Sequence, residues 1–298
     1  MMTMKNALPY ITEGKDQVLS MMFHFQHQEA DCFITEWVHT PFRLRKMKKA
    51  FSSWQYALYG RAWNSLYLEN HDHARIINRY GNVKYHKESG KMLATMCYLQ
   101  CGTPFIYQGQ EIGMLNIKID SLDKYKDVLT FNNYKIFKKL GISDEKFLKI
   151  ANRSSRENAR TPMQWSGAKY AGFSDEKPWF ELNPNYKKIN VEEQEKDPDS
   201  ILNYYRRLIK LRKENEIFIY GDYKEHNKLS GSLYVYERNY EGRRAIIICS
   251  FKEKGIKFTA LQGFDLSKGE LVLCNYGTAD IKDNSFVTRP YEARVYLF

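Results

Sequence analysis

Apolar residues in the first third of the chain occur in short runs that end abruptly in polar residues. Runs at 18–26, 63–68 and 104–107 have the length and composition of buried strands. Between them, apolar residues at spacings of three and four predict helices at 42–59 and 88–100. Alternating strands and helices are typical of parallel α/β architecture, in which ligands bind at the carboxyl ends of the strands.

A long and weakly periodic segment, 115–200, follows the last of these strands. It contains two short helix-like pieces, 133–140 and 143–151, and a turn-rich stretch at 178–186. So long a connection inside an α/β domain is usually functional. We therefore expect this segment to contribute to a ligand site.

The pattern changes at about residue 217, where the apolar period becomes two. Alternating runs separated by glycine- and asparagine-rich turns predict strands at 233–236, 245–249, 271–273 and 293–298. The sequence therefore predicts two domains, an α/β part at 1–216 and an all-β part at 217–298.

The last helix of the α/β part is predicted at 201–216, where apolar residues form one face. Either Ser200 or Asp199 can cap its N-terminus, because both side chains accept a hydrogen bond from a first-turn amide. The sequence leaves the choice between them open.

Composition narrows the class of protein only a little. The 298 residues are 43% hydrophobic, enough for a sizeable core, and the 22 tyrosines suit carbohydrate stacking as well as packing. The formal charge of +11 is spread among acidic residues, and its densest run, 43–49, is interpreted as the solvated face of the helix at 42–59. Since no nucleic-acid recognition module accompanies this run, we expect no nucleic-acid partner.

Several other classes of site and location are disfavoured. No apolar run reaches the roughly 20 residues of a membrane span, so we expect no membrane partner. Five irregularly spaced cysteines are interpreted as buried reduced thiols, which favours the cytoplasm. The chain has no phosphate-cradling glycine-rich loop and no serine nucleophile elbow. His71 and His73 have no third ligand at a matching spacing, so we expect no metal and no cofactor.

The most informative polar cluster is Asn70-His71-Asp72, directly after the strand at 63–68. A carboxylate and an imidazole at the end of an apolar strand lie where a barrel enzyme places its active site. Asp72 also has an ordinary alternative role, because aspartate is a good cap for a following helix. Spacing alone leaves the two roles equally open.

Four longer motifs resemble one protein family. YLENHDHARIINRYGN (67–82) and GTPFIYQGQEIGM (102–114) resemble the segments of the seventh and eighth barrel strands of α-amylase-type enzymes. SRENARTPMQWS (155–166) resembles their oligo-1,6-glucosidase subgroup, which also contains trehalose-6-phosphate hydrolases and dextran glucosidases. TRPYEARVYLF (288–298) resembles the last strand of their C-terminal domain. The resemblance implies the C-terminal half of a (β/α)8 TIM barrel followed by an all-β domain, a β-sandwich.

The resemblance carries roles over to single residues. Asp72 matches the carboxylate that grips the sugar hydroxyls and stabilises the oxocarbenium-like transition state. His71 matches the histidine that hydrogen-bonds the same glucose unit, and Arg156 matches an arginine that helps to hold the non-reducing end. Gln110 and Glu111 lie where the family lines the mouth of the pocket. The resemblance therefore implies one catalytic residue and four substrate-binding residues.

Other positions near these motifs are less clear. For Arg160 and Trp165, anchoring of the loop explains the residues at least as well as substrate contact does. The family usually has glutamine after the catalytic aspartate and then proline-arginine, whereas this chain has His73-Ala74-Arg75. Loss of the proline is expected to loosen the turn slightly without changing the carboxylate.

The resemblance implies a function that the chain carries only in part. A retaining glycosidase needs a nucleophile and an acid/base about 5 Å apart. In the family both precede everything present here, and Glu29 and Asp31 are in no matching motif. We therefore expect an oligo-1,6-glucosidase-like α-glucosidase for short oligosaccharides that lacks this pair and is inactive alone. Trehalose-6-phosphate hydrolysis and non-catalytic carbohydrate binding remain alternatives.

Half of a barrel also has physical consequences for the chain. It exposes the inner face of its sheet and two unpaired strand edges. We therefore expect the isolated chain to be poorly stable, or to associate with an N-terminal barrel half as its partner.

Overall fold

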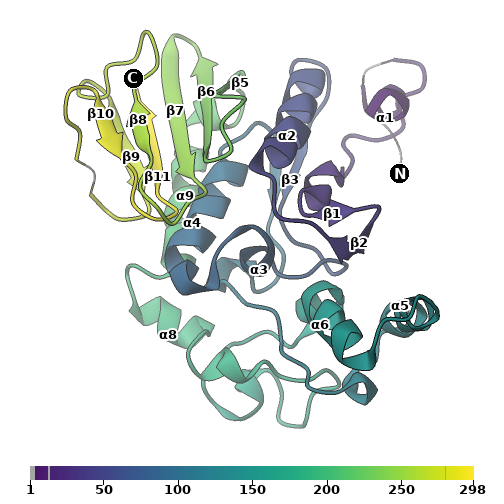
Figure 1. Ribbon diagram of the computed structural model, residues 1–298. Coiled ribbons are helices and arrows are strands. Elements are labelled where there is room, and N and C mark those ends of the chain that lie inside the picture. Colours follow the sequence, from purple (N-terminus) through teal and green to yellow (C-terminus); the bar gives the residue numbers. More distant parts are fainter. Residues whose placement is uncertain (1–3, 13, 279) are drawn as a thin grey trace.

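The computed structural model describes residues 4–12, 14–278 and 280–298 (Figure 1). The α-helices are α1 (Met4–Ile11), α2 (Leu44–Leu58), α3 (Ile76–Tyr80), α4 (His86–Tyr98), α5 (Val128–Lys139), α6 (Asp144–Ser154), α7 (Glu157–Arg160), α8 (Val191–Lys196) and α9 (Ile201–Glu214). The strands are β1 (Cys32–Phe33), β2 (Thr35–His39), β3 (Ser65–Tyr67), β4 (Thr103–Phe105), β5 (Lys224–His226), β6 (Leu233–Tyr240), β7 (Arg243–Ser250), β8 (Lys257–Thr259), β9 (Glu270–Cys274), β10 (Ser285–Val287) and β11 (Ala293–Leu297).

Two of the predicted strands pair in parallel and position the candidate site. β3 and β4 lie side by side with Leu66 opposite Pro104, and α3 and α4 connect them. Gly102 permits this close approach, because a Cβ at its φ of +136° would lie 2.6 Å from the Asn64 carbonyl oxygen. Since parallel strands end at the same edge, the polar residues that follow β3 and β4 come together there.

The prediction of a strand at 18–26 is wrong. Residues 18–25 form neither helix nor strand, and Val18 is 71% exposed. Side chains connect the segment to β3 instead, since the Tyr67 hydroxyl donates to the carbonyl oxygen of His24 at 2.8 Å. A strand needs a neighbouring strand as its backbone partner, and none of the strands in the described residues pairs with this segment, in which Val18, Leu19 and Phe23 are exposed.

Three predicted helices are confirmed within a few residues. The helices expected at 42–59, 88–100 and 201–216 are α2, α4 and α9. Ser200 is the cap of α9, because its hydroxyl accepts the Asn203 amide at 3.1 Å. The sequence missed the three-residue strands β5, β8 and β10, which are too short to show an alternating pattern.

The C-terminal strands form a five-stranded antiparallel sheet in the order β5-β6-β7-β11-β9, with the pair β8–β10 beside it. Figure 1 shows this sheet at one end of the molecule, next to α4 and α9. Helix α4 packs against β7, β11 and α9, so one hydrophobic core continues across residue 217. The opposite face of the sheet is covered by a second cluster, which consists of Leu233, Val235, Ile246, Ile248, Phe258, Phe264, Leu266, Phe286 and Tyr296.

The basic face of α2 is not entirely solvated as expected, because Lys48 is only 1% exposed. Its Nζ lies 3.6 Å from Glu225 Oε1 in β5 and donates to the Asn227 carbonyl oxygen at 2.6 Å. Ser52 of α2 also donates to Glu225, at 2.6 Å. Burial lowers the pKa of the Lys48 ammonium. This buried ion pair joins α2 to the C-terminal sheet.

The cysteines agree with the expectation of reduced thiols. All five cysteines are free thiols, four of them buried and Cys101 half-buried. Within the described ranges, none of the helices combines the length and the apolar character that crossing a membrane requires.

The buried His24 is expected to make the stability of the chain depend on pH. The His24 ring stacks on Trp54 with ring centroids 4.7 Å apart, and burial lowers its pKa to about 3. Because unfolded histidine titrates near 6.5, the unfolded chain binds the extra proton first as the pH falls from about 6.5 toward 3, and stability decreases over that window. His24→Phe is expected to reduce the loss of stability between pH 8 and pH 5 by ~2 kcal/mol, measured by urea unfolding at both values. An unchanged difference between the two pH values would contradict this role of His24.

Candidate functional site

The turn after β3 is built around Asn70. Its Oδ1 accepts the Asp72 amide at 2.8 Å and lies 2.6 Å from Nδ1 of His73. His73 Nε2 lies 2.6 Å from Oε1 of Glu36 in β2. His73, which stands where the family usually has glutamine, therefore ties the turn to a second element and counters the loosening expected from the missing proline.

Asp72 does not cap the next helix. The first amide of α3, that of Ile76, donates to Oε1 of Glu69 at 2.8 Å. The other oxygen of Glu69 accepts from Arg75 Nη1 at 3.0 Å, and both side chains are buried. Burial raises the pKa of Glu69 despite the pairing with Arg75. Because Glu69 takes the capping role, the Asp72 carboxylate is left for another.

Two arginines from the segment after α6 converge on Asp72. Its Oδ1 accepts from Arg156 Nη1 at 3.2 Å and from Arg160 Nη2 at 3.1 Å. Arg156 also makes a bidentate pair with Asp127, in which Nε and Nη2 each donate at 2.6 Å. Arg160 Nη1 lies 3.7 Å from the same carboxylate. Two carboxylates and two guanidinium groups therefore form one charge-balanced cluster.

Asp127 is the member of this cluster that sequence reasoning missed. It caps α5 by accepting the Leu129 amide at 2.9 Å, and its own amide donates to Glu157 at 2.7 Å. Burial works against ionisation of Asp127, but the hydrogen bonds from Arg156 and from the Leu129 amide, together with the charges of Arg156 and Arg160, outweigh it and hold the pKa below its ordinary value. The helix was expected to begin at 133, so the capping position of Asp127, which a start at 128 would have revealed, stayed hidden.

His71 lies on the open side of the cluster. Its side chain is 68% exposed, and its Nε2 lies 3.4 Å from Oδ2 of Asp72, whose side chain is 43% exposed. Arg160 Nε donates to the His71 carbonyl oxygen at 2.9 Å, which fixes the backbone of the turn. A carboxylate oxygen and an imidazole nitrogen so close together match two adjacent hydroxyl groups of a sugar, which can donate to one and accept from the other.

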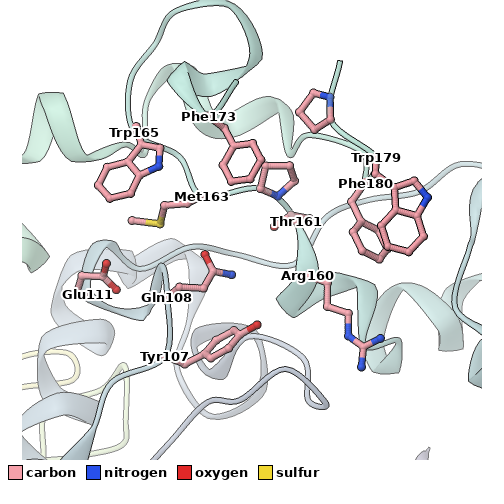
Figure 2. Close-up of a pocket in the computed structure, with 12 residues that line it drawn as sticks. Tyr107, Gln108, Glu111, Arg160, Thr161, Met163, Trp165, Phe173, Trp179 and Phe180 are labelled. Carbon is pink, nitrogen blue, oxygen red and sulfur yellow. The ribbon is translucent and has the colours of Figure 1, made fainter. Parts of the chain in front are cut away.

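The structure separates Gln110 from Glu111. Gln110 is buried, and its amide donates to the hydroxyls of Tyr98 and Tyr205 at 2.7 and 2.8 Å. It therefore packs in the interior and does not line a pocket mouth, which corrects the expectation for this residue. Glu111 does line a cavity of about 600 Å³, shared with Trp165 (Figure 2).

A group of potential metal ligands lies elsewhere, at β1 and β2. Ligand atoms of Asp31, Cys32 and His39 lie within 4.8 Å of one another. Arg79 Nη2 pairs with Asp31 at 2.7 Å, and Arg153 lies 3.8 Å from the same carboxylate. Two guanidinium groups already neutralise Asp31, so this arrangement is a buried ion-pair cluster rather than a cation site.

Comparison with known proteins identifies the family. Residues 1–221 match the family model described as the alpha amylase catalytic domain. The chain belongs to the α-amylase family. An oligo-1,6-glucosidase of Halalkalibacterium halodurans is 42% identical over 301 residues, which cover 99% of this chain and 53% of that protein. An oligo-1,6-glucosidase of Bacillus cereus is 39% identical over 297 residues, with coverage of 99% and 53%.

Solved structures of the α-amylase family agree with the sequence comparison. The trehalose-6-phosphate hydrolase of Bacillus licheniformis matches with a TM-score of 0.93 and 37% identity, covering 99% of this chain and 54% of that one. The chain therefore has part of the (β/α)8 barrel fold of α-amylase family glycosidases, as the sequence predicted. It spans about half the length of the curated relatives that it matches.

Proposed function

We propose that the chain supplies the glucose-binding and transition-state-stabilising part of a retaining α-glucosidase of the oligo-1,6-glucosidase type. Such an enzyme hydrolyses terminal α-glucosidic bonds of short oligosaccharides. The observation that carries the proposal is the Asp72 carboxylate, which accepts from Arg156 and Arg160 through Oδ1 and keeps Oδ2 beside His71.

Each residue of the site has a distinct role in this proposal. Asp72 binds two hydroxyls of the terminal glucose and offsets the positive charge that develops on its ring as the bond breaks. His71 donates to one of the same hydroxyls. Arg156 fixes the Asp72 carboxylate and lines the sugar pocket. Asp127 acts as a positioning residue, because it accepts two hydrogen bonds from Arg156. Arg160 shares the anchoring of Asp72.

The nucleophile and the acid/base of such an enzyme come, in this proposal, from the part of the relatives that this chain does not cover. A polypeptide that supplies this part would complete the barrel around β3 and β4. Exposed apolar side chains in the segment 18–25, in β1, β2 and β4 and between β1 and β2 support such a partner, since exposed apolar surface often marks an interface. They are Val18, Leu19, Phe23, Phe33, Ile34, Val38 and Phe105.

The remaining parts of the chain have structural and cellular roles in the same proposal. Residues 1–216 form the barrel part, and 217–298 form a C-terminal β-sandwich made of the five-stranded sheet and the pair β8–β10. Its function is to cover α4 and α9, with which it shares a core. The five free thiols fit a reducing compartment such as the cytoplasm.

A neutral glucoside fits the site better than a phosphorylated one. A phosphate needs cations that are not already paired. Within the described part of the cluster, both Arg156 and Arg160 contact Asp72 and Asp127, which balance their charge. We therefore rank trehalose-6-phosphate hydrolysis second, as a reaction that only the similarity to trehalose-6-phosphate hydrolases such as the Bacillus licheniformis enzyme supports.

Binding to the 298-residue chain tests the site itself. Isomaltose is expected to bind, and Asp72→Asn and His71→Ala are each expected to weaken its binding about tenfold, since each weakens or removes one hydrogen bond to the sugar. Calorimetric titration measures the dissociation constants. Glu145→Gln, an exposed carboxylate of α6 paired with Lys149, is the matched control and should not change them. Binding of trehalose-6-phosphate tenfold tighter than isomaltose would reverse the ranking, and binding insensitive to both variants would refute the site.

A further inference from the structure

The cavity beside Arg160 is bounded by two segments that are far apart in the sequence. Tyr107, Gln108 and Glu111 follow β4, and the opposite wall comes from the segment after α7. Figure 2 shows Trp165 and Phe173 on one side of the space and Tyr107, Gln108 and Glu111 on the other. Its volume of about 600 Å³ lies in the range of small-molecule sites.

One wall of this cavity is aromatic and unusually exposed. Trp165 is 50% exposed, Phe173 49% and Trp179 73%. Aromatic side chains of this size normally bury most of their surface, and three that expose theirs around one cavity mark a binding surface. Flat aromatic faces suit the C–H faces of a pyranose ring, as they suit other flat, partly apolar ligands.

The facing wall is polar and incompletely hydrogen-bonded. Glu111 Oε2, Gln108 Oε1 and Thr161 Oγ1 are buried without a hydrogen-bond partner within the described chain. Burial raises the pKa of Glu111. Buried polar atoms are seldom left unpaired, and three in the lining of one cavity indicate that a ligand with hydroxyl groups completes them. Hydroxyls suit this wall because each can both donate and accept a hydrogen bond. A phosphate suits it less, because it has few protons to donate and would lie against the acceptor oxygens of the Glu111 carboxyl group.

The cavity adjoins the site at Asp72. Arg160 lines it and at the same time donates to Asp72 Oδ1 at 3.1 Å. We infer that the cavity is a second carbohydrate-binding site, which takes a neutral sugar unit other than the one held by Asp72 and His71. Trp165, with Trp179, stacks on the ring, and Glu111 and Gln108 accept its hydroxyls. The inference rests on the proposed function in one respect, which is that the sugar is part of a glucose oligosaccharide.

Fluorine NMR of the 298-residue chain labelled with 5-fluorotryptophan tests the inference, because each of the five tryptophans gives its own resonance. Isomaltotriose is the probe, and Trp165→Phe assigns the key signal. We expect saturable shifts of the Trp165 and Trp179 resonances, with those of the buried Trp37 and Trp54 unchanged as internal controls of the fold. Trp165→Ala and Trp179→Ala are each expected to weaken binding at the cavity about tenfold. Phe131→Ala, at an exposed aromatic of α5 outside this cavity, should leave the titration unchanged.

The Asp72→Asn variant separates the two sites. If the inference is correct, isomaltotriose still shifts the Trp165 resonance of Asp72→Asn at an unchanged midpoint. No shift in the wild-type chain, or a shift that disappears in Asp72→Asn, would overturn the second site. Failure of the proposed function looks different, because isomaltose binding would then be insensitive to Asp72→Asn and His71→Ala, whatever the Trp165 resonance does.

Discussion

Asp72→Asn is expected to lower turnover roughly 10²–10³-fold in an enzyme completed with the part of the Halalkalibacterium halodurans oligo-1,6-glucosidase that this chain does not cover. The amide keeps the shape of the carboxylate but loses the negative charge that faces the developing oxocarbenium ion. The loss should therefore appear mainly in kcat, with a smaller change in KM, because the charge arises only in the transition state. Steady-state hydrolysis of isomaltose measures both.

The control for this variant is an exposed carboxylate of the segment after α7, outside the cluster. Asp175→Asn changes an exposed aspartate between Phe173 and Trp179 and should leave kcat within about twofold. If Asp72→Asn behaves like Asp175→Asn, Asp72 has no part in the chemistry. If it raises KM with kcat unchanged, Asp72 binds the sugar uniformly and does not stabilise the transition state.

Arg75→Met is expected to destabilise the chain by about 3–5 kcal/mol, because it leaves the buried Glu69 carboxylate without its partner. Arg75 is fully buried, and beyond Glu69 it donates to the carbonyl oxygens of Gln108 at 2.7 Å and Asn158 at 3.2 Å. It thus joins the ends of β3 and β4 to α7. The effect should appear as a lower midpoint of urea unfolding with little change in the slope.

An exposed pair of the same chemistry provides the comparison. Lys149→Met removes the partner of Glu145, whose carboxylate lies 2.8 Å away on the surface of α6, and should shift the unfolding midpoint little because water replaces the lost contact. A midpoint for Arg75→Met as close to wild type as that of Lys149→Met would show that Glu69 is neutral or hydrated, against the buried pairing. Loss of isomaltose binding by Arg75→Met under conditions where it stays folded would show that Arg75 also positions the turn at Asp72.

The sequence predicted the parts of the fold that depend on local pattern. The helical spacing of apolar residues located α2, α4 and α9, and the change of period near 217 located the C-terminal sheet. The prediction of a strand at 18–26 failed because hydrophobic composition does not show whether a neighbouring strand is present to pair with, and none of the described strands pairs with this segment. The prediction that Lys48 is solvated failed for a related reason. Its partner Glu225 is 177 residues away, and no spacing on α2 indicates that contact.

For the candidate site too, contiguous motifs predicted some features and only the structure showed the others. Motifs alone identified Asp72, His71 and Arg156, and the structure brings Asp72 into contact with both of the others. Gln110 and Glu111 are neighbours in the sequence, yet one side chain points into the core and the other lines a cavity. Both lie in the short 3-10 helix Gln110–Ile112, and consecutive side chains of such a helix point about 120° apart because it has three residues per turn.

By itself, the sequence determined the class of architecture, the family and the strand end where the candidate site lies, because these follow from periodicity and from motifs of contiguous residues. Only the tertiary structure decided what the Asp72 carboxylate contacts. Glu69 caps α3 in its place, and Arg156 and Arg160, more than 80 residues further along the chain, hold it together with Asp127. The role of a carboxylate depends on which charges and amides lie within about 3 Å of it, and contacts between segments so distant in sequence are set by packing.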